Sequence, residues 1–133
     1  MSNAAIQLAP QTVILSQSSQ TYSSDGDSGS LDASGFRRII VGIDCTAGSG
    51  FPGTAIFFNV DGQGPDGQWY TLNLTWRMSS TGPYVAFSDY PSPSVGSNPA
   101  LQMSFPVMPT IRLRWQLNGM ASATFGYWLM GQY

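Results

Sequence analysis

Apolar and polar residues alternate along much of this chain with a period of two, the period that a β-strand imposes on its side chains. The clearest alternation covers residues 111–117, and residues 121–132 show a second one. Asn118-Gly119 lies between them, and this dipeptide suits the positive φ angles of a two-residue hairpin turn. We therefore predict that the two segments form a C-terminal hairpin.

Further alternating segments fill the middle of the chain. Residues 55–61 and 70–78 predict a second hairpin, because Pro65-Asp66-Gly67 between them is typical of a turn. Residues 36–47 predict one more strand. Weaker strand patterns occur at residues 12–18, 84–87 and 101–105, and the polar segments 20–35 and 88–99 predict long loops.

The same pattern predicts the fold class. No segment shows a 3.6-residue apolar repeat flanked by helix caps, so we expect an all-β protein. About eight short strands favour a single antiparallel β-sandwich over residues 12–133, and jelly-roll connections are one option for its topology. Arg112 and Arg114 are expected outside the core. The side chains expected to be buried together are Ile39, Val41, Ile43, Leu72, Leu74, Ile111, Leu113, Trp115, Leu117 and Phe125.

Residues 1–11 differ from the rest of the chain. Residues 1–10 carry no charged side chain and show no alternation beyond Ile6 and Leu8. Ordering each residue costs roughly 1–2 kcal/mol of backbone entropy, which such a segment has to offset by burying area against something else. We expect an N-terminal arm that lies on a neighbouring subunit or another protein surface, with Ile6 and Leu8 as apolar anchors.

Two strands carry apolar residues on both faces. Trp128 and Met130 lie opposite the core face of the last strand, and Phe57 lies opposite Ile56 and Phe58. A strand that is apolar on both faces is covered on both. In so small a domain the second cover is often a partner subunit, so these residues are candidate interface residues.

Composition narrows the choice of partner. Only 9% of the 133 residues are charged, and all of these are Asp or Arg. A surface with so little charge lowers the desolvation cost of docking to protein. The net charge of −2 and the scattered Arg residues argue against a nucleic-acid partner. The chain has no apolar run near ~18 residues and no signal-peptide pattern, so we expect synthesis in a cytoplasm and no membrane partner.

Catalytic groups are scarce. The chain has no His and no Lys, so the common general bases near neutral pH and the Ser–His and Cys–His pairs are missing. Cys45 lies in an alternating apolar stretch, which indicates a buried small side chain. Residues 25–32 space their oxygen atoms like a calcium loop but lack its distal Glu, which favours a flexible polar loop. We expect a binding protein with no cofactor and no enzymatic activity.

Several short motifs resemble those of one family. Residues 43–50 read IDCTAGSG and residues 60–70 read VDGQGPDGQWY; later come GPYV at 82–85, PTIRLRW at 109–115 and ASATFGY at 121–127. In this order they resemble a family of small proteins encoded among the structural genes of tailed bacteriophages, over about residues 36–129. Family members usually carry Asp-Pro in the turn where this chain has Gly64-Pro65-Asp66.

The resemblance implies a β-sandwich protein of the virion and supplies no catalytic residue. We expect a capsid decoration or cement protein that binds the major capsid protein or other virion proteins and forms a homo-oligomer in the phage particle. One alternative is a carbohydrate- or receptor-binding module on a tail or head fibre, because aromatic residues make up 13% of the chain. Another is a glycan-cleaving enzyme, which would need two close Asp carboxylates.

Deletion of residues 2–10 tests the predicted arm. We expect the shortened chain to fold, because the predicted core lies outside the arm, and to bind expanded capsids more weakly than the full chain. Circular dichroism checks the fold, and co-sedimentation with capsids measures binding. Equal binding by the two forms would contradict the arm.

Overall fold

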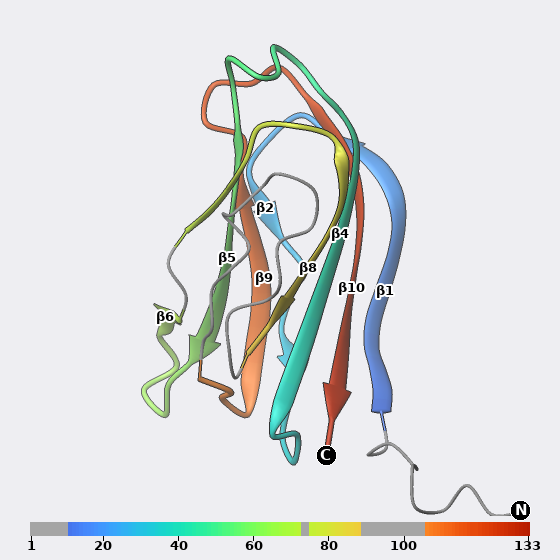
Figure 1. Ribbon diagram of the computed structural model, residues 1–133. Coiled ribbons are helices and arrows are strands. Elements are labelled where there is room, and N and C mark those ends of the chain that lie inside the picture. Colours follow the sequence, from blue (N-terminus) through green and yellow to red (C-terminus); the bar gives the residue numbers. More distant parts are fainter. Residues whose placement is uncertain (1–10, 73–74, 89–105) are drawn as a thin grey trace, which may run out of the picture.

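The computed structural model describes residues 11–72, 75–88 and 106–133, and this part of the chain contains ten β-strands and no helix (Figure 1). The strands are β1 (Gln11–Tyr22), β2 (Gly26–Asp27), β3 (Leu31–Asp32), β4 (Arg38–Gly48), β5 (Ile56–Gln63), β6 (Trp69–Thr71), β7 (Trp76–Met78), β8 (Gly82–Phe87), β9 (Thr110–Gln116) and β10 (Ala123–Gln132). Every pair of neighbouring strands is antiparallel. The predicted all-β antiparallel sandwich is confirmed.

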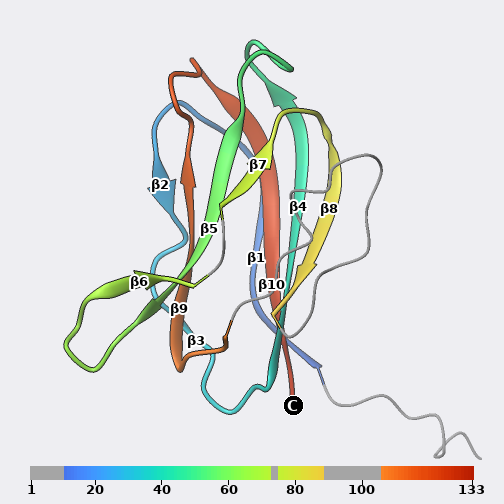
Figure 2. The ribbon, with the colours of Figure 1, turned by 60° about the vertical axis from the view of Figure 1, so that its left-hand side comes forward.

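Two sheets form the layers of the sandwich (Figures 1 and 2). Sheet A has the order β1-β10-β4-β8; sheet B has the order β2-β9-β5-β6, with β3 also on β9 and β7 also on β5. If β2 with β3 and β6 with β7 are each taken as one interrupted strand, eight strands remain. The first then pairs with the eighth, the second with the seventh, the third with the sixth and the fourth with the fifth. This is the strand order of a jelly roll.

The predicted C-terminal hairpin is wrong. Its turn exists, since Asn118 and Gly119 have φ angles of 50° and 88° and the Met120 amide donates to the Leu117 carbonyl at 3.0 Å. The strands on either side do not pair, however, because β9 joins β5 in sheet B and β10 joins β1 and β4 in sheet A. Leu117 and Met120 are both buried, so the connection crosses the end of the sandwich and helps to close its core.

The predicted hairpin in the middle of the chain is confirmed. β5 pairs with β6 and then with β7, so the single strand predicted for residues 70–78 is interrupted. Gly67 has a φ of 81° at the tip, where its amide donates to the Gly64 carbonyl at 2.9 Å. If β2 with β3 and β6 with β7 are each counted as one strand, this is the one connection in the described part of the chain that joins consecutive strands of the same sheet, as the jelly roll requires.

Residues 20–35 are more regular than the predicted loop. β1 continues to Tyr22, and the short strands β2 and β3 both pair with β9. Between them, Ser28 donates its amide to the Leu113 carbonyl at 2.8 Å and accepts the Leu113 amide on its hydroxyl at 3.0 Å. The prediction of a flexible polar loop over residues 25–32 is therefore wrong. β2 and β3 pair with β9, and the Ser28 hydroxyl continues the hydrogen bonding to β9 between them.

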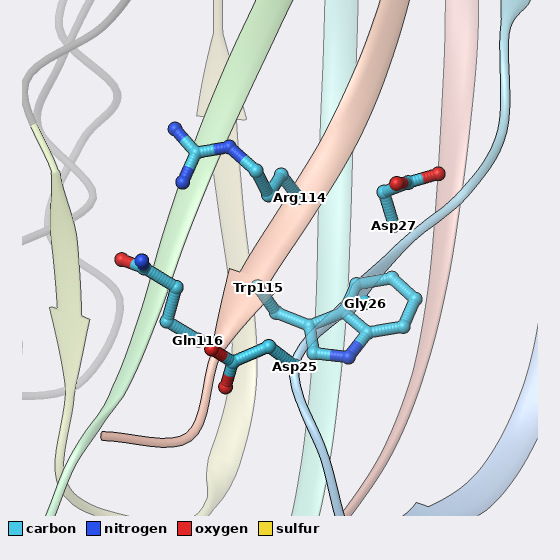
Figure 3. Close-up of a pocket in the computed structure, with 6 residues that line it drawn as sticks. All are labelled: Asp25, Gly26, Asp27, Arg114, Trp115 and Gln116. Carbon is cyan, nitrogen blue, oxygen red and sulfur yellow. The ribbon is translucent and has the colours of Figure 1, made fainter.

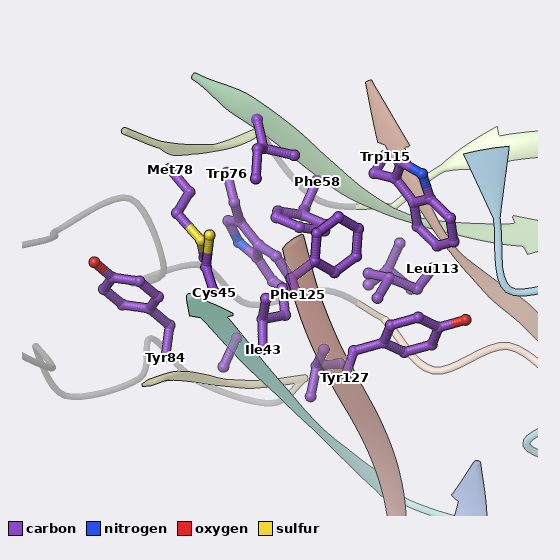
Figure 4. Packing of buried hydrophobic residues seen from close by; sticks show 14 of the residues in the cluster. Ile43, Cys45, Phe58, Trp76, Met78, Tyr84, Leu113, Trp115, Phe125 and Tyr127 are labelled. Atoms are coloured by element: carbon purple, nitrogen blue, oxygen red, sulfur yellow. The ribbon is translucent and has the colours of Figure 1, made fainter. Parts of the chain in front are cut away.

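The core lies between the sheets and contains most of the predicted side chains (Figure 4). Leu72 is only partly buried, and Leu74 lies outside the described residues, as does the strand predicted at 101–105. The remaining eight predicted residues are all buried: Ile39, Val41, Ile43, Ile111, Leu113, Trp115, Leu117 and Phe125. Cys45 is buried among them, as predicted.

One strand offers a direct test of this register. Phe58 faces the core and meets Phe125 edge to face at 5.2 Å, whereas Phe57 lies on the outer side of sheet B. We expect Phe58→Ala to lower the free energy of unfolding by about 3–5 kcal/mol, because it leaves a cavity in a packed core. Phe57→Ala is the matched control and should cost about 1 kcal/mol or less. Urea unfolding measures both; equal losses would show that the register is misplaced by one residue.

Candidate functional site

One row of side chains on the outer face of sheet A is apolar across all four strands. Val13, Met130, Ile40 and Phe87 are paired in register from β1 through β10 and β4 to β8, so they form one continuous row. A second row contains Trp128 and Val85. Five of these six side chains are half-buried, and Val13 is 58% exposed. We call these six residues the apolar face.

Trp128 lies flat against its own sheet. Its indole ring covers Gly42 of β4, where no space is left for a Cβ atom. Arg38 borders the apolar face, with its guanidinium carbon 5.8 Å from the centre of the Phe87 ring and Nη1 donating to Gln132 Oε1 at 3.1 Å. Glycine at position 42 thus lets a large aromatic ring lie on the outer surface without standing away from it.

The candidate interface residues fall into three groups. Trp128 and Met130 belong to the apolar face, where the alternation placed them. Phe57 is half-buried on the outer side of sheet B, opposite Arg77 and Gln116, so the structure does not bring it together with the other two. Ile6 and Leu8 lie outside the described residues.

The outer face of sheet B is built around a buried carboxylate. Asp61 of β5 is only 1% exposed although it points away from the core. Its Oδ2 accepts hydrogen bonds from Arg112 Nε and Arg114 Nε, both at 2.8 Å, and its Oδ1 accepts one from Arg114 Nη2 at 3.2 Å. The arginine side chains are 21% and 26% exposed, so they cover the carboxylate and keep part of each guanidinium at the surface.

This pairing keeps the Asp61 carboxylate ionised. Burial alone would raise the pKa of Asp61, but hydrogen bonds from Arg114 and Arg112 and their positive charges outweigh it, and the pKa lies below its ordinary value. The hydrogen bond from Arg114 to Asp61 in turn raises the pKa of Arg114. An isolated buried carboxylate would be strongly destabilising, so the two guanidiniums are required for this position to hold Asp.

Neighbouring side chains fix both guanidiniums further. The Arg112 guanidinium lies over the Trp69 ring, 4.4 Å from its centre, and its Nη1 is 3.6 Å from Asp27 Oδ2. Arg114 Nη2 also donates to Thr71 Oγ1 at 3.2 Å. β2, β5, β6 and β9 therefore all contribute to one polar cluster, consisting of Asp27, Asp61, Trp69, Thr71, Arg112 and Arg114.

A small open pocket of about 270 Å³ adjoins this cluster (Figure 3). Asp25, Gly26 and Asp27 line it from the β2 side, and Arg114, Trp115 and Gln116 line it from β9. The described residues hold no group of three or more His, Cys, Asp or Glu side chains placed to bind a metal ion. None of the described segments forms a helix long and apolar enough to cross a membrane.

The sequence reasoning placed Arg112 and Arg114 correctly outside the core but missed their partner. The available signal was Asp61 within an otherwise apolar strand, at a position of the same parity as Phe57. Recognising the pair requires the register in which Asp61 lies opposite Arg112, and the two are 51 positions apart along the chain. The pocket was missed because it depends on β2, which the polar pattern of residues 20–35 does not predict.

Asp61→Asn tests the charge cluster. At pH 7 we expect a loss of about 2–4 kcal/mol in the free energy of unfolding, because two partly buried guanidiniums lose their counter-charge. The contribution of Asp61 is fully present above the unfolded-state pKa of about 3.9 and is lost as the pH falls through the lower folded-state pKa. The gap between wild type and variant should therefore narrow towards pH ~2.

Asp44→Asn serves as the control, because Asp44 is exposed on the outer side of sheet A. Guanidinium chloride unfolding at pH 7, 4 and 2 measures the three proteins. A gap between wild type and Asp61→Asn that is small at pH 7, or constant with pH, would show that Asp61 does not hold the arginines by charge.

Comparison with known proteins supports the fold. No protein-family model matches the sequence, and no curated protein is significantly similar to it. Among solved structures, the SPBc2 prophage-derived protein YomS aligns with a TM-score of 0.51 and 11% identity, over 97% of this chain and all of YomS. A carbohydrate-binding module, CBM28, specific for non-crystalline cellulose, aligns with a TM-score of 0.38 and 12% identity, over 91% of this chain and 70% of that one; a match this weak carries no argument. The similarity to YomS shows a shared fold over 97% of this chain and all of YomS.

Proposed function

We propose that this protein is a structural component of a tailed-phage particle, where it decorates or cements the capsid shell through the apolar face of sheet A. The observation that carries the proposal is the in-register row Val13–Met130–Ile40–Phe87, which leaves a face with no charged side chain in its two central rows. A sheet face of this kind is typical of a protein–protein contact.

The size of the face favours many weak contacts over a single tight one. Four strands ~4.8 Å apart and two rows ~7 Å apart give a projected area of roughly 300 Å², below the ~800 Å² per partner of a stable interface. Contacts from the N-terminal arm would add to this area, because β1 begins at Gln11 beside the same edge of sheet A. On a shell with many equivalent sites, weak contacts of this kind are multiplied by multivalency.

Two further observations support a place in a phage particle. The motifs of residues 36–129 resemble those of small proteins from phage structural gene clusters, and the fold is shared with a protein of prophage origin over 97% of this chain. The proposed partners are the major capsid protein and further copies of this chain, and the proposed role is binding without catalysis. Carbohydrate binding would favour a different surface, because Trp128 is the one side chain of the apolar face with a hydrogen-bonding group.

A charge placed on the apolar face tests the proposal. Val13 is well exposed, so Val13→Asp should fold normally while bringing an unpaired carboxylate into the contact. We expect its apparent affinity for purified expanded capsids to fall at least about tenfold, the effect of about 1.4 kcal/mol. Co-sedimentation over a range of protein concentrations measures the affinity.

The matched control is Thr46→Asp, which places the same charge on an exposed position of β4 in the same sheet, away from the two rows. Its binding should equal that of the wild type. Mass spectrometry of purified particles should also find many copies of the protein. Absence from particles, or equal binding by Val13→Asp and wild type, would reject the decoration role.

A further inference from the structure

The outer face of sheet B has a chemistry quite different from that of the apolar face. Apart from threonine, its side chains on β5, β6, β7 and β9 are planar polar groups or aromatic rings. Its outward-pointing residues on β5, β6, β7 and β9 are Phe57, Asn59, Asp61, Gln63, Trp69, Thr71, Arg77, Arg112, Arg114 and Gln116. Planar donors and acceptors with aromatic rings are well suited to hydroxyl-rich ligands, which need several directed hydrogen bonds.

Two carboxylates in the pocket are held so that each keeps an oxygen for a ligand. Asp25 Oδ1 accepts the Leu117 amide at 2.8 Å, and Asp27 Oδ1 accepts the Gly29 amide at 2.7 Å. Within the described residues Asp25 Oδ2 has no hydrogen-bond partner, and Asp27 Oδ2 has only the 3.6 Å contact with Arg112. The backbone thus orients two strong acceptors before any ligand arrives.

Residues of β9 contribute donors to the pocket lining. Arg114 uses Nε and Nη2 on Asp61 and Thr71, which fixes the guanidinium and leaves Nη1 without a partner among the described residues. Gln116 is exposed at the end of β9 and offers both a donor and an acceptor. Asp25 and Asp27 thus contribute acceptors, and Arg114 and Gln116 contribute donors, to the lining of one pocket (Figure 3).

From this arrangement we infer that the pocket binds one sugar ring of a neutral glycan. Vicinal hydroxyl groups donate to carboxylates and accept from guanidinium and amide groups, so they match both sides of the pocket. The volume of about 270 Å³ lies just under the ~300 Å³ at which pockets for small molecules begin, which suits a single ring. Two carboxylates against one guanidinium disfavour sugars that carry an acid group.

The inference does not depend on the proposed function, because it concerns the other sheet. A domain that contacts a shell through the outer face of sheet A leaves the outer face of sheet B directed away from that shell (Figure 2). Both contacts can therefore be made at once. Failure of either one leaves the other intact, since Val13→Asp and the pocket variants change different sheets.

The test is a glycan array probed with the full-length protein, carrying neutral hexose and N-acetylhexosamine oligosaccharides beside oligosaccharides that contain uronic or sialic acid. We expect binding to at least one neutral glycan. Asp27→Asn and Gln116→Ala should each weaken it about tenfold, the effect of one lost hydrogen bond to a ligand. Gln20→Ala, an exposed glutamine in a strand of the other sheet, is the matched control and should bind like the wild type.

A second measurement locates the site. In two-dimensional NMR, titration with the bound oligosaccharide should shift the Trp115 indole signal, because Trp115 lines the pocket, and leave that of Trp128 on sheet A unchanged. EDTA should not affect binding, since the carboxylates are expected to contact the sugar directly. The inference is overturned if no neutral glycan binds, if only acid-bearing glycans bind, if both pocket variants bind normally, or if EDTA abolishes binding.

Discussion

The two sheets are held together by a cluster of aromatic rings centred on Phe125. Its ring lies 4.5 Å from that of Tyr22, 5.2 Å from Phe58 and 5.4 Å from Trp115, so it contacts side chains from both layers. Phe125 belongs to β10, which pairs with β1 on one side and β4 on the other. Once this ring points inward, the period of two directs Trp128 and Met130 outward, and the apolar face follows from the packing of the core.

The sequence predicted the core-facing side chains best in strands whose alternation of apolar and polar residues matches their burial. The residues of β4, β5, β9 and β10 show their core faces clearly, because a strand between two layers has to bury every second side chain. The Asn118-Gly119 dipeptide was misleading, since a tight turn has the same local chemistry whether the chain returns within a sheet or crosses to the other one. Here the chain crosses to the other sheet, and Leu117 and Met120 are buried at the end of the core. Their burial depends on contacts with residues that are distant along the chain.

The polar cluster could not be predicted from the sequence for a related reason. A single Asp in an apolar strand is compatible with a bulge, a turn or a surface position, and only the partner strand shows that two arginines neutralise it. The same holds for the pocket, whose acceptors are oriented by the amides of Leu117 and Gly29. The sequence thus predicted a sandwich and the outward position of Trp128 and Met130, whereas the charged site required the register between strands that are far apart along the chain.

The pairing of the first strand with the last also constrains how the molecule is made. β10 is a central strand of sheet A, yet it follows both β1 and β4 along the chain, so β1 and β4 have no neighbour between them until β10 has left the ribosome. Strand pairings of such long range form slowly, because the chain has to close large loops before any contact compensates for the lost entropy. The nascent chain therefore exposes the apolar sides of two long strands until β10 emerges, which makes folding sensitive to chaperones and to the local concentration of other nascent copies.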